Sequence, residues 1–191
     1  VETFKVAAPQ LTADSFVYNG EAQTVSLTDD TYVDISANVQ TDKGDYNAVA
    51  ALKDKANYEW TAGGKADIEL PWSITAKEIT LKAETSVDKT YDGDAYDFSG
   101  YVVSGADGFY ARDNVIVTVS AGDIYVPGSY DITVNHNAND NYNVTVEQTE
   151  AKLTINKAVL TVTAKDAEIE YTGNIITFEF DITAGKVGED D

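Results

Sequence analysis

The residues that could carry out catalysis are few, and the chain's single imidazole belongs to His136. There is no cysteine, so zinc thiolate sites, disulfides and thiol catalysis are excluded. A nucleophilic hydroxyl needs an adjacent base, and no Gly-x-Ser-x-Gly motif supplies the usual setting for one. We expect His136 to lie in a solvated hairpin loop. The sequence therefore predicts no catalytic residues and no enzyme activity.

Side-chain oxygens recur around this histidine, in the stretch NHNANDNYN at residues 135–143. Alternating oxygens resemble half of a calcium loop, with Asn137, Asn139 and Asp140 as the candidate metal ligands. An EF-hand loop would need glycine at its sixth position and glutamate at its twelfth, where Asp140 and Val146 stand. Asn and Asp also dominate turns because their side chains bond the local backbone. We therefore expect no cofactor, with weak Ca²⁺ binding as the alternative.

A second candidate site is the stretch GADGFYARD, residues 105–113, where two aromatic residues precede an arginine. We expect an exposed loop there, and exposed aromatic residues in a loop insertion often mark a contact site. Phe109, Tyr110 and Arg112 are the predicted ligand contacts, for a glycan or for a host or cell-surface protein. Neighbouring tyrosines are expected to pack the core instead.

Two further kinds of chemistry have little support in the sequence. Adjacent carboxylates such as Asp29-Asp30 point to opposite faces of a strand and do not converge on one bond, so we expect solvated charge. A Lys–Asn isopeptide cross-link, with Lys77, Lys82 or Lys157 as the amine, has no motif in its favour and stays an open alternative.

The charge of the chain restricts its partners. There are 33 acidic and 13 basic residues, for a formal net charge of −20. Such a surface repels phosphate backbones and anionic lipid, so we expect no nucleic-acid partner. No apolar run approaches the roughly 20 residues of a membrane span, which predicts no membrane insertion. The chain opens at Val1 and contains no Met, and we interpret it as a piece of a longer protein.

Two stretches of the chain repeat each other without a gap: residues 44–60 and residues 128–144. Glycine, tyrosine and an Asn-Tyr pair fall in the same places in both stretches: Gly44 and Gly128, Tyr46 and Tyr130, Asn57-Tyr58 and Asn141-Tyr142. This tandem repeat predicts four parts. They are a closing strand of a preceding repeat at 1–9, a first repeat at 10–77, a second repeat at 78–158 with an insertion near 105–113, and the truncated start of a third repeat at 159–191.

The pattern within each repeat predicts an all-β fold. Short alternating segments are separated by turn residues, and no stretch carries a helical stripe with caps. We expect an immunoglobulin-like β-sandwich in each repeat, with β-grasp-like repeats as the alternative. Without a flexible linker between repeats, they should form an elongated rod. The predicted core residues are Tyr46, Leu52, Ile74, Leu81, Val102, Ile132, Val134 and Ile155.

The order of the motifs resembles that of the MBG/YDG-type repeats, which occur in tandem in large bacterial cell-surface and secreted adhesin-like proteins. A Tyr-x-Gly turn, at Tyr18, Tyr91 and Tyr171, precedes the Gly-x-Tyr and Asn-Tyr motifs, and closing strands such as ITAKEITL follow. The resemblance implies an extracellular stalk or adhesion module, cell-wall attached or secreted, without enzyme activity. Two alternatives stay open: a module that binds glycan or host protein through the insertion, and an accessory domain of a surface glycoside hydrolase.

The two ends of the chain predict self-association. Residues 1–9 would supply a closing strand without its domain, and 159–191 would supply opening strands without a closing one. Unpaired strand edges favour pairing with another chain. We therefore expect the N-terminal strand of one molecule to be a candidate donor for the C-terminal segment of another.

Overall fold

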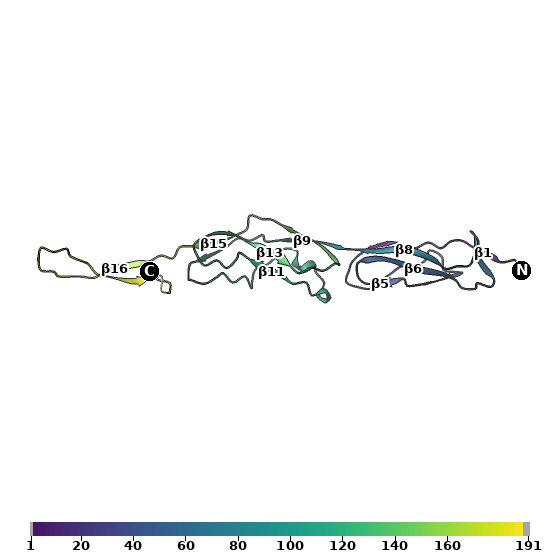
Figure 1. The fold of residues 1–191 in the computed structure, drawn as a ribbon, viewed down its shortest axis with the longest axis horizontal. Helices are drawn as coiled ribbons and strands as arrows, with labels where there is room; N and C mark the ends of the chain where they lie inside the picture. Colours follow the sequence, from purple (N-terminus) through teal and green to yellow (C-terminus); the bar gives the residue numbers. More distant parts are fainter. Residues whose placement is uncertain (1, 189–191) are drawn as a thin grey trace. The chain divides into compact units, whose positions relative to one another are not determined.

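The computed structural model describes residues 2–188, and their regular structure is almost entirely β (Figure 1). Over these residues the helical elements are two single 3₁₀ turns, η1 at Ala106–Gly108 and η2 at Ala111–Asp113. The prediction of an all-β fold without a helix longer than two turns is confirmed for the described residues. None of these residues form a helix with the length and apolarity needed to cross a membrane.

The strands are short and follow one another closely. The first half of the chain contains β1 (Phe4–Val6), β2 (Ser15–Val17), β3 (Gln23–Thr24), β4 (Val33–Ser36), β5 (Val39–Gln40), β6 (Gly44–Leu52), β7 (Tyr58–Trp60), β8 (Ile68–Thr75) and β9 (Lys77–Lys82). The second half contains β10 (Val87–Thr90), β11 (Val117–Ser120), β12 (Gly128–Asp131), β13 (Thr133–His136), β14 (Tyr142–Glu147), β15 (Lys152–Asn156), β16 (Thr161–Ala164) and β17 (Phe180–Ala184).

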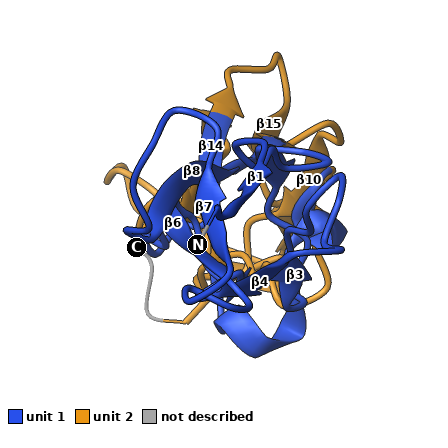
Figure 2. Ribbon diagram, turned by 90° about the vertical axis from the view of Figure 1, so that its right-hand side faces the viewer, with its two compact units in different colours: residues 1–80, 105–116, 136–145 blue, residues 81–104, 117–135, 146–191 orange. Residues whose placement is uncertain are grey.

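The chain divides into two compact units, and their boundaries cut across the sequence repeats (Figure 2). Unit 1 contains residues 1–80, 105–116 and 136–145, and unit 2 contains residues 81–104, 117–135 and 146–191. Two segments that the sequence assigns to the second repeat, 105–116 and 136–145, therefore pack with the first. The repeat boundaries describe which segments resemble each other in sequence, whereas the two units describe which segments pack together. The repeat boundaries stay a prediction.

Unit 1 is built on a four-stranded sheet in the order β2-β8-β6-β4. Strand β2 runs parallel to β8, whereas β6 is antiparallel to both β8 and β4. Alternate residues of β6 are buried, as expected for a strand with one face on a core. Ala50 and Leu52 of β6 belong to a cluster of buried side chains. The other members of the cluster are Val6, Leu27, Val33 and Trp60.

Unit 2 contains a smaller sheet, β10-β15-β12, with the same pairing pattern. Strand β10 runs parallel to β15 and β12 runs antiparallel to it. The registers agree residue by residue, because Gly44 lies opposite Ile74 in unit 1 and Gly128 lies opposite Ile155 in unit 2. The Gly-x-Tyr motifs therefore hold equivalent places in two sheets.

The Gly-x-Tyr motif has a steric explanation. The hydroxyl of Tyr46 donates a hydrogen bond of 2.6 Å to the carbonyl of Asp42, and that of Tyr130 donates one of 3.0 Å to the carbonyl of Val126. Each ring folds back over the glycine two residues earlier to reach this carbonyl. A Cβ on Gly44 would lie 2.8 Å from Cζ of Tyr46, closer than such atoms approach. Only glycine leaves room for the ring.

Six of the eight predicted core residues are buried: Leu52, Ile74, Leu81, Ile132, Val134 and Ile155. Tyr46 is half-buried because its ring covers the backbone turn. The prediction for Val102 is wrong, since its side chain is 81% exposed and Val103 is buried instead. Ser104 exchanges backbone hydrogen bonds with Lys82, so alternation turns Val103 to the side that buries Leu81.

Both ends of the described chain have paired strands. Strand β1 runs parallel to β7, and Val6 of β1 belongs to the core of unit 1. The N–H of Phe4 donates to the carbonyl of Asn57 at 2.8 Å, as that of Lys77 donates to the carbonyl of Asn141 at 2.9 Å. Strand β1 thus corresponds to β9. Whether residues 1–9 also close a preceding repeat stays a prediction.

The C-terminal strands pair with each other. Strand β16 runs antiparallel to β17, and every residue of both strands is exposed. Because β1 already has a partner in its own chain, donating it to another molecule would first break its bonds to β7. Self-association through strand edges stays a prediction.

Candidate functional site

The most elaborate polar cluster lies in unit 1 and begins at the first Tyr-x-Gly turn. This turn, Tyr18-Asn19-Gly20, directly follows β2. The side chain of Asn19 accepts a hydrogen bond from the N–H of Glu21 at 2.9 Å, and Gly20 has φ of 80°. A Cβ on Gly20 would lie 2.9 Å from Cγ of Tyr110. Glycine is needed both for the turn and for the approach of that ring.

Residues 105–114 reach this turn through the two 3₁₀ turns. Turn η1 follows Gly105, and η2 is capped at its C-terminus by Asn114, which has φ of 49°. Asn adopts this left-handed conformation more readily than most residues. Between the two turns the backbone is extended. The result is that Tyr110, Arg112 and Asp113 all contact the Tyr-x-Gly turn.

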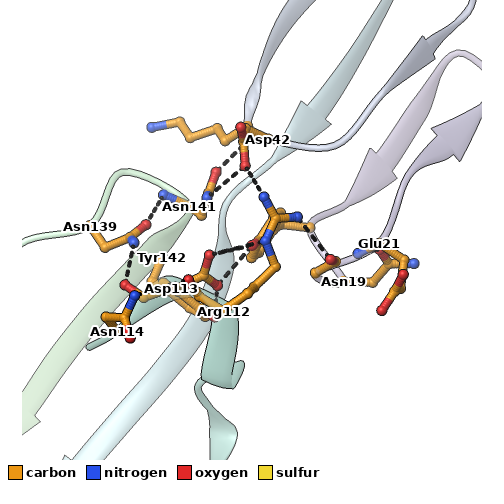
Figure 3. A network of polar contacts seen from close by, with 12 residues as sticks. Asn19, Glu21, Asp42, Arg112, Asp113, Asn114, Asn139, Asn141 and Tyr142 are labelled. Atoms are coloured by element: carbon orange, nitrogen blue, oxygen red, sulfur yellow. Dashed lines mark hydrogen bonds and ion pairs between the residues drawn. The ribbon is translucent and has the colours of Figure 1, made fainter. Parts of the chain in front are cut away.

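At the centre is a carboxylate held by two phenols. The hydroxyl of Tyr18 donates to the carboxylate of Asp113, and its oxygen lies 2.8 Å from Oδ1 and 2.7 Å from Oδ2. The hydroxyl of Tyr142 donates to Oδ2 of Asp113 at 2.5 Å (Figure 3). Tyr18 is 1% exposed and the side chain of Asp113 is 5% exposed. We call these three residues the tyrosine–aspartate cluster. Its hydrogen bonds are shielded from water, which strengthens them.

Both phenols of the tyrosine–aspartate cluster are protonated far above neutral pH. Burial, followed by the hydrogen bond to Asp113, raises the pKa of Tyr142 to about 12. The same two causes, in the same order, raise the pKa of Tyr18 further. The cluster therefore does not exchange protons near neutral pH through its phenols. Such an arrangement holds segments together and does not resemble a catalytic acid–base pair.

Aromatic rings surround the tyrosine–aspartate cluster. The ring of Tyr18 packs edge-on against Tyr110 and Tyr142, with centroids 5.8 and 5.5 Å apart, and Phe109 packs against Tyr142 at 4.9 Å. The ammonium of Lys77 lies 4.1 Å from the centre of the Tyr110 ring. Edge-on ring pairs and the cation over the ring are both favourable. Residues from distant parts of the sequence thus form one packed layer.

A polar rim joins the same segments closer to solvent (Figure 3). The guanidinium of Arg112 donates to the carbonyl of Gly20 at 2.9 Å and lies 3.5 Å from the carboxylate of Asp42. The side chain of Asn141 donates to that carboxylate at 3.1 Å and accepts from the N–H of Lys43 at 2.8 Å. The Asn-Tyr motif therefore places one residue in the rim and the next in the tyrosine–aspartate cluster.

The predicted ligand contacts lie in this packed region. Phe109 and Tyr110 are half-buried, not exposed as expected, because both rings pack against Tyr142. The side chain of Arg112 keeps 45% of its surface exposed. A role in ligand binding for these three residues stays a prediction, and the aromatic pair has an internal function in any case.

The candidate calcium ligands are bonded to the backbone. The side-chain oxygen of Asn137 accepts from the N–H of Ile116 at 2.5 Å, and that of Asn139 accepts from the N–H of Asn141 at 3.0 Å. Asp140 is exposed. His136 ends β13 and is half-buried, so it does not lie in a solvated loop. Among residues 2–188, no group of three or more His, Cys, Asp or Glu is placed to hold a metal ion. Calcium binding stays a prediction.

Sequence reasoning missed the tyrosine–aspartate cluster, although it identified two of its motifs. Tyr18 belongs to the Tyr-x-Gly turn and Tyr142 to the Asn-Tyr pair, so both were marked as repeated positions. The signal for Asp113 was its place in the insertion, 95 residues after Tyr18. No local pattern connects residues at such a separation.

Comparison with known proteins adds no identification. The chain matches no protein-family model, and the search of curated proteins finds no significant relative.

Proposed function

We propose that this chain is a non-enzymatic spacer and adhesion repeat of a large bacterial cell-surface or secreted protein. The observation that carries the proposal is the tyrosine–aspartate cluster. Its three polar groups bond one another and are shielded from water, so the cluster supplies attachment between segments. A protein that holds two sites apart needs such internal connections.

We further propose that each repeat has immunoglobulin-like topology. In such a sandwich the last strand and its neighbour lie in one sheet, and a tyrosine near the start of that neighbour bonds the backbone a few residues upstream. Strand β6 next to β8 has this arrangement, with Tyr46 bonded to Asp42. The pair β3–β5, outside that sheet, fits the second layer.

The extracellular location is proposed on composition and on the resemblance to adhesin-like repeats. A net charge of −20 keeps a long chain soluble. A chain without cysteine does not depend on the redox state of its surroundings. Both features suit a surface protein.

Mechanical loading tests the spacer function. The chain is held by its two ends and extended, and the force at which it yields is compared between the wild type and Asp113→Ala. We expect a lower force for the variant, because both phenols lose their acceptor. Asp131→Ala is the control, since the Asp131 side chain is exposed and its carboxylate pairs with Lys152 across the β12–β15 pair. Equal forces for wild type and Asp113→Ala would overturn the proposal.

The alternative function is recognition of a glycan or host protein by the insertion. The exposure of the Arg112 side chain favours it, while the internal packing of Phe109 and Tyr110 does not. Glycan-array binding that Arg112→Ala abolishes, without loss of thermal stability, would support this alternative. An accessory role in a surface glycoside hydrolase would instead require binding to that enzyme's own substrate.

A further inference from the structure

Unit 1 contains a second, open copy of the acceptor side of the tyrosine–aspartate cluster. Within the stretches 44–60 and 128–144, matching residues are 84 positions apart, as in Gly44 and Gly128 or Tyr58 and Tyr142. The same spacing relates Asp29 to Asp113, and the strand that follows begins four residues after each aspartate, at β4 and at β11. Asp29 and Tyr58 thus correspond to Asp113, which accepts the hydrogen bond of Tyr18, and to Tyr142, whose ring packs against Tyr18.

The surroundings of Asp29 form a hollow that other groups do not fill. It has a volume of about 470 Å³ and is lined by Phe4, Lys5, Asp29 and Tyr32 among other residues. The rings of Phe4, Tyr32 and Tyr58 pack together beside it, with centroids 5.1 to 6.0 Å apart. Phe4 is 53% exposed. An aromatic wall and a carboxylate are again side by side.

The carboxylate of Asp29 has acceptor capacity to spare. It is exposed and accepts a hydrogen bond from the N–H of Thr31 at 2.9 Å. Hydrogen bonds from Thr31 hold the pKa of Asp29 below its usual range, so it is ionised at neutral pH. A carboxylate has two oxygens and room for several donors.

A bare Tyr-x-Gly turn is present in the same chain, at Tyr171-Thr172-Gly173. Gly173 has φ of 75°, close to the 80° of Gly20, so the two glycines share the left-handed conformation. Tyr171 is 92% exposed, whereas Tyr18 is 1% exposed. A Cβ on Gly173 would meet nothing within 4 Å. The glycine of this turn has the same sign and size of φ as Gly20, and the place of its Cβ is open.

We propose that the hollow lined by Phe4, Asp29 and Tyr32, with the Tyr58 ring packed beside it, binds the Tyr171–Gly173 turn of a second copy of this chain. The phenol of Tyr171 donates to the carboxylate of Asp29, as that of Tyr18 does to Asp113, and its ring packs against the aromatic wall. One copy supplies the turn and the next supplies the hollow. The contact is head-to-tail, which extends into chains unless it closes into a ring.

The contact differs from strand exchange, because β1 keeps its pairing with β7. It also goes beyond the proposed function: its failure would leave the internal tyrosine–aspartate cluster intact. Each copy carries a charge of −20, so the copies repel one another at low ionic strength. Added salt screens this repulsion and should strengthen the association.

Sedimentation velocity with complementary variants tests the proposal. Tyr171→Ala lacks the phenol and Asp29→Ala lacks its acceptor, so each variant alone should associate more weakly than the wild type. A mixture of the two retains one intact contact, between Asp29 of the first variant and Tyr171 of the second. We expect the wild type to form concentration-dependent oligomers in moderate salt, each variant alone to lose about tenfold or more in association constant, and the mixture to form dimers without longer oligomers.

Tyr125→Ala is the matched control, because Tyr125 is an exposed tyrosine outside both surfaces, and it should associate as the wild type does. Tyr171→Phe keeps the ring and removes the hydroxyl, so it should weaken association as well. Wild-type chain that stays monomeric at millimolar concentration in moderate salt would overturn the proposal. So would single variants that associate as strongly as the wild type, or a mixture that stays monomeric.

Discussion

The phenol of Tyr18 lies 2.7 Å from the carboxylate of Asp113, although 95 residues separate them in the sequence. Tyr18 belongs to the turn after the first short strand of the sheet, and Asp113 ends η2. Their bond joins two distant segments of the chain within unit 1.

Replacing Asp113 by Ala should destabilise unit 1 clearly. Tyr18 and Tyr142 would each lose a buried acceptor, and a buried donor without a partner costs about 1–3 kcal/mol. We expect a loss of about 2–4 kcal/mol in the free energy of unfolding, measured by urea denaturation. Asp131→Ala, at an exposed ion pair, should change it little. Similar values for the two variants would show that Asp113 is not the buried acceptor described here.

Stability should fall at alkaline pH in a way that depends on the two phenols. Their pKa values are raised in the folded state, to about 12 for Tyr142 and higher for Tyr18. A raised pKa contributes stability that is complete below the unfolded value of about 10. That stability is lost as pH rises from about 10 through the folded pKa. The contribution of these two phenols to the free energy of unfolding should therefore not change with pH below pH 9 and should decrease above pH 10.

The double variant Tyr18→Phe/Tyr142→Phe is the control for this pH dependence. It removes both ionisations and should show a shallower decrease above pH 10, measured as unfolding free energy against pH. Titration of the tyrosinate absorbance should agree, with two phenols ionising only near or beyond pH 12 in the wild type. Parallel pH profiles for wild type and variant would contradict the assignment.

Replacing Gly44 by Ala should push the Tyr46 ring away from the backbone of residue 44 and destabilise the protein. The added Cβ would lie 2.8 Å from Cζ and Oη of Tyr46, so the hydrogen bond to Asp42 would be lost. Overpacking of this kind costs about 1–3 kcal/mol. Gly100→Ala is the control, because its Cβ would meet nothing within 4 Å. In a Tyr46→Ala background the cost of Gly44→Ala should largely disappear, and a cost that persists would refute the steric explanation.

Val103 and Val102 offer a direct test of strand register. Val103 is 9% exposed and Val102 is 81% exposed, so only Val103→Ala removes buried methyl groups. We expect a loss of about 1–2 kcal/mol for Val103→Ala, since each buried methylene contributes roughly 0.8 kcal/mol. Val102→Ala should be close to neutral. Thermal unfolding of both variants is the measurement, and the reverse order would place the strand one residue out of register.

The fold was more predictable from the sequence than the site. Period-two alternation and turn residues predicted the all-β class, and six of the eight chosen core residues are buried. Two adjacent valines carry no period of their own, so alternation does not distinguish Val102 from Val103. The backbone hydrogen bonds between Ser104 and Lys82 determine which of the two is buried. Tyr46 is half-buried because its hydroxyl bonds the backbone carbonyl of Asp42. The alternation of apolar and polar residues does not predict such a bond.

The site depends on a contact between distant segments. The motifs drew attention to Tyr18 and Tyr142 as repeated residues, but they gave no partner for either. Phe109 and Tyr110 were expected to be exposed, because a loop insertion rich in aromatic residues is usually solvent-facing. Their packing follows from the position of the first Tyr-x-Gly turn in unit 1, which only the folded chain specifies.

A double-mutant cycle between Tyr18→Phe and Asp113→Ala tests the central claim most directly. The free energies of unfolding of the wild type, the two single variants and the double variant give the coupling between the two side chains. Our account predicts a coupling of about 1–3 kcal/mol, as found for residues that share a buried hydrogen bond. Coupling within about 0.3 kcal/mol of zero, the range for independent sites, would contradict a direct bond between Tyr18 and Asp113.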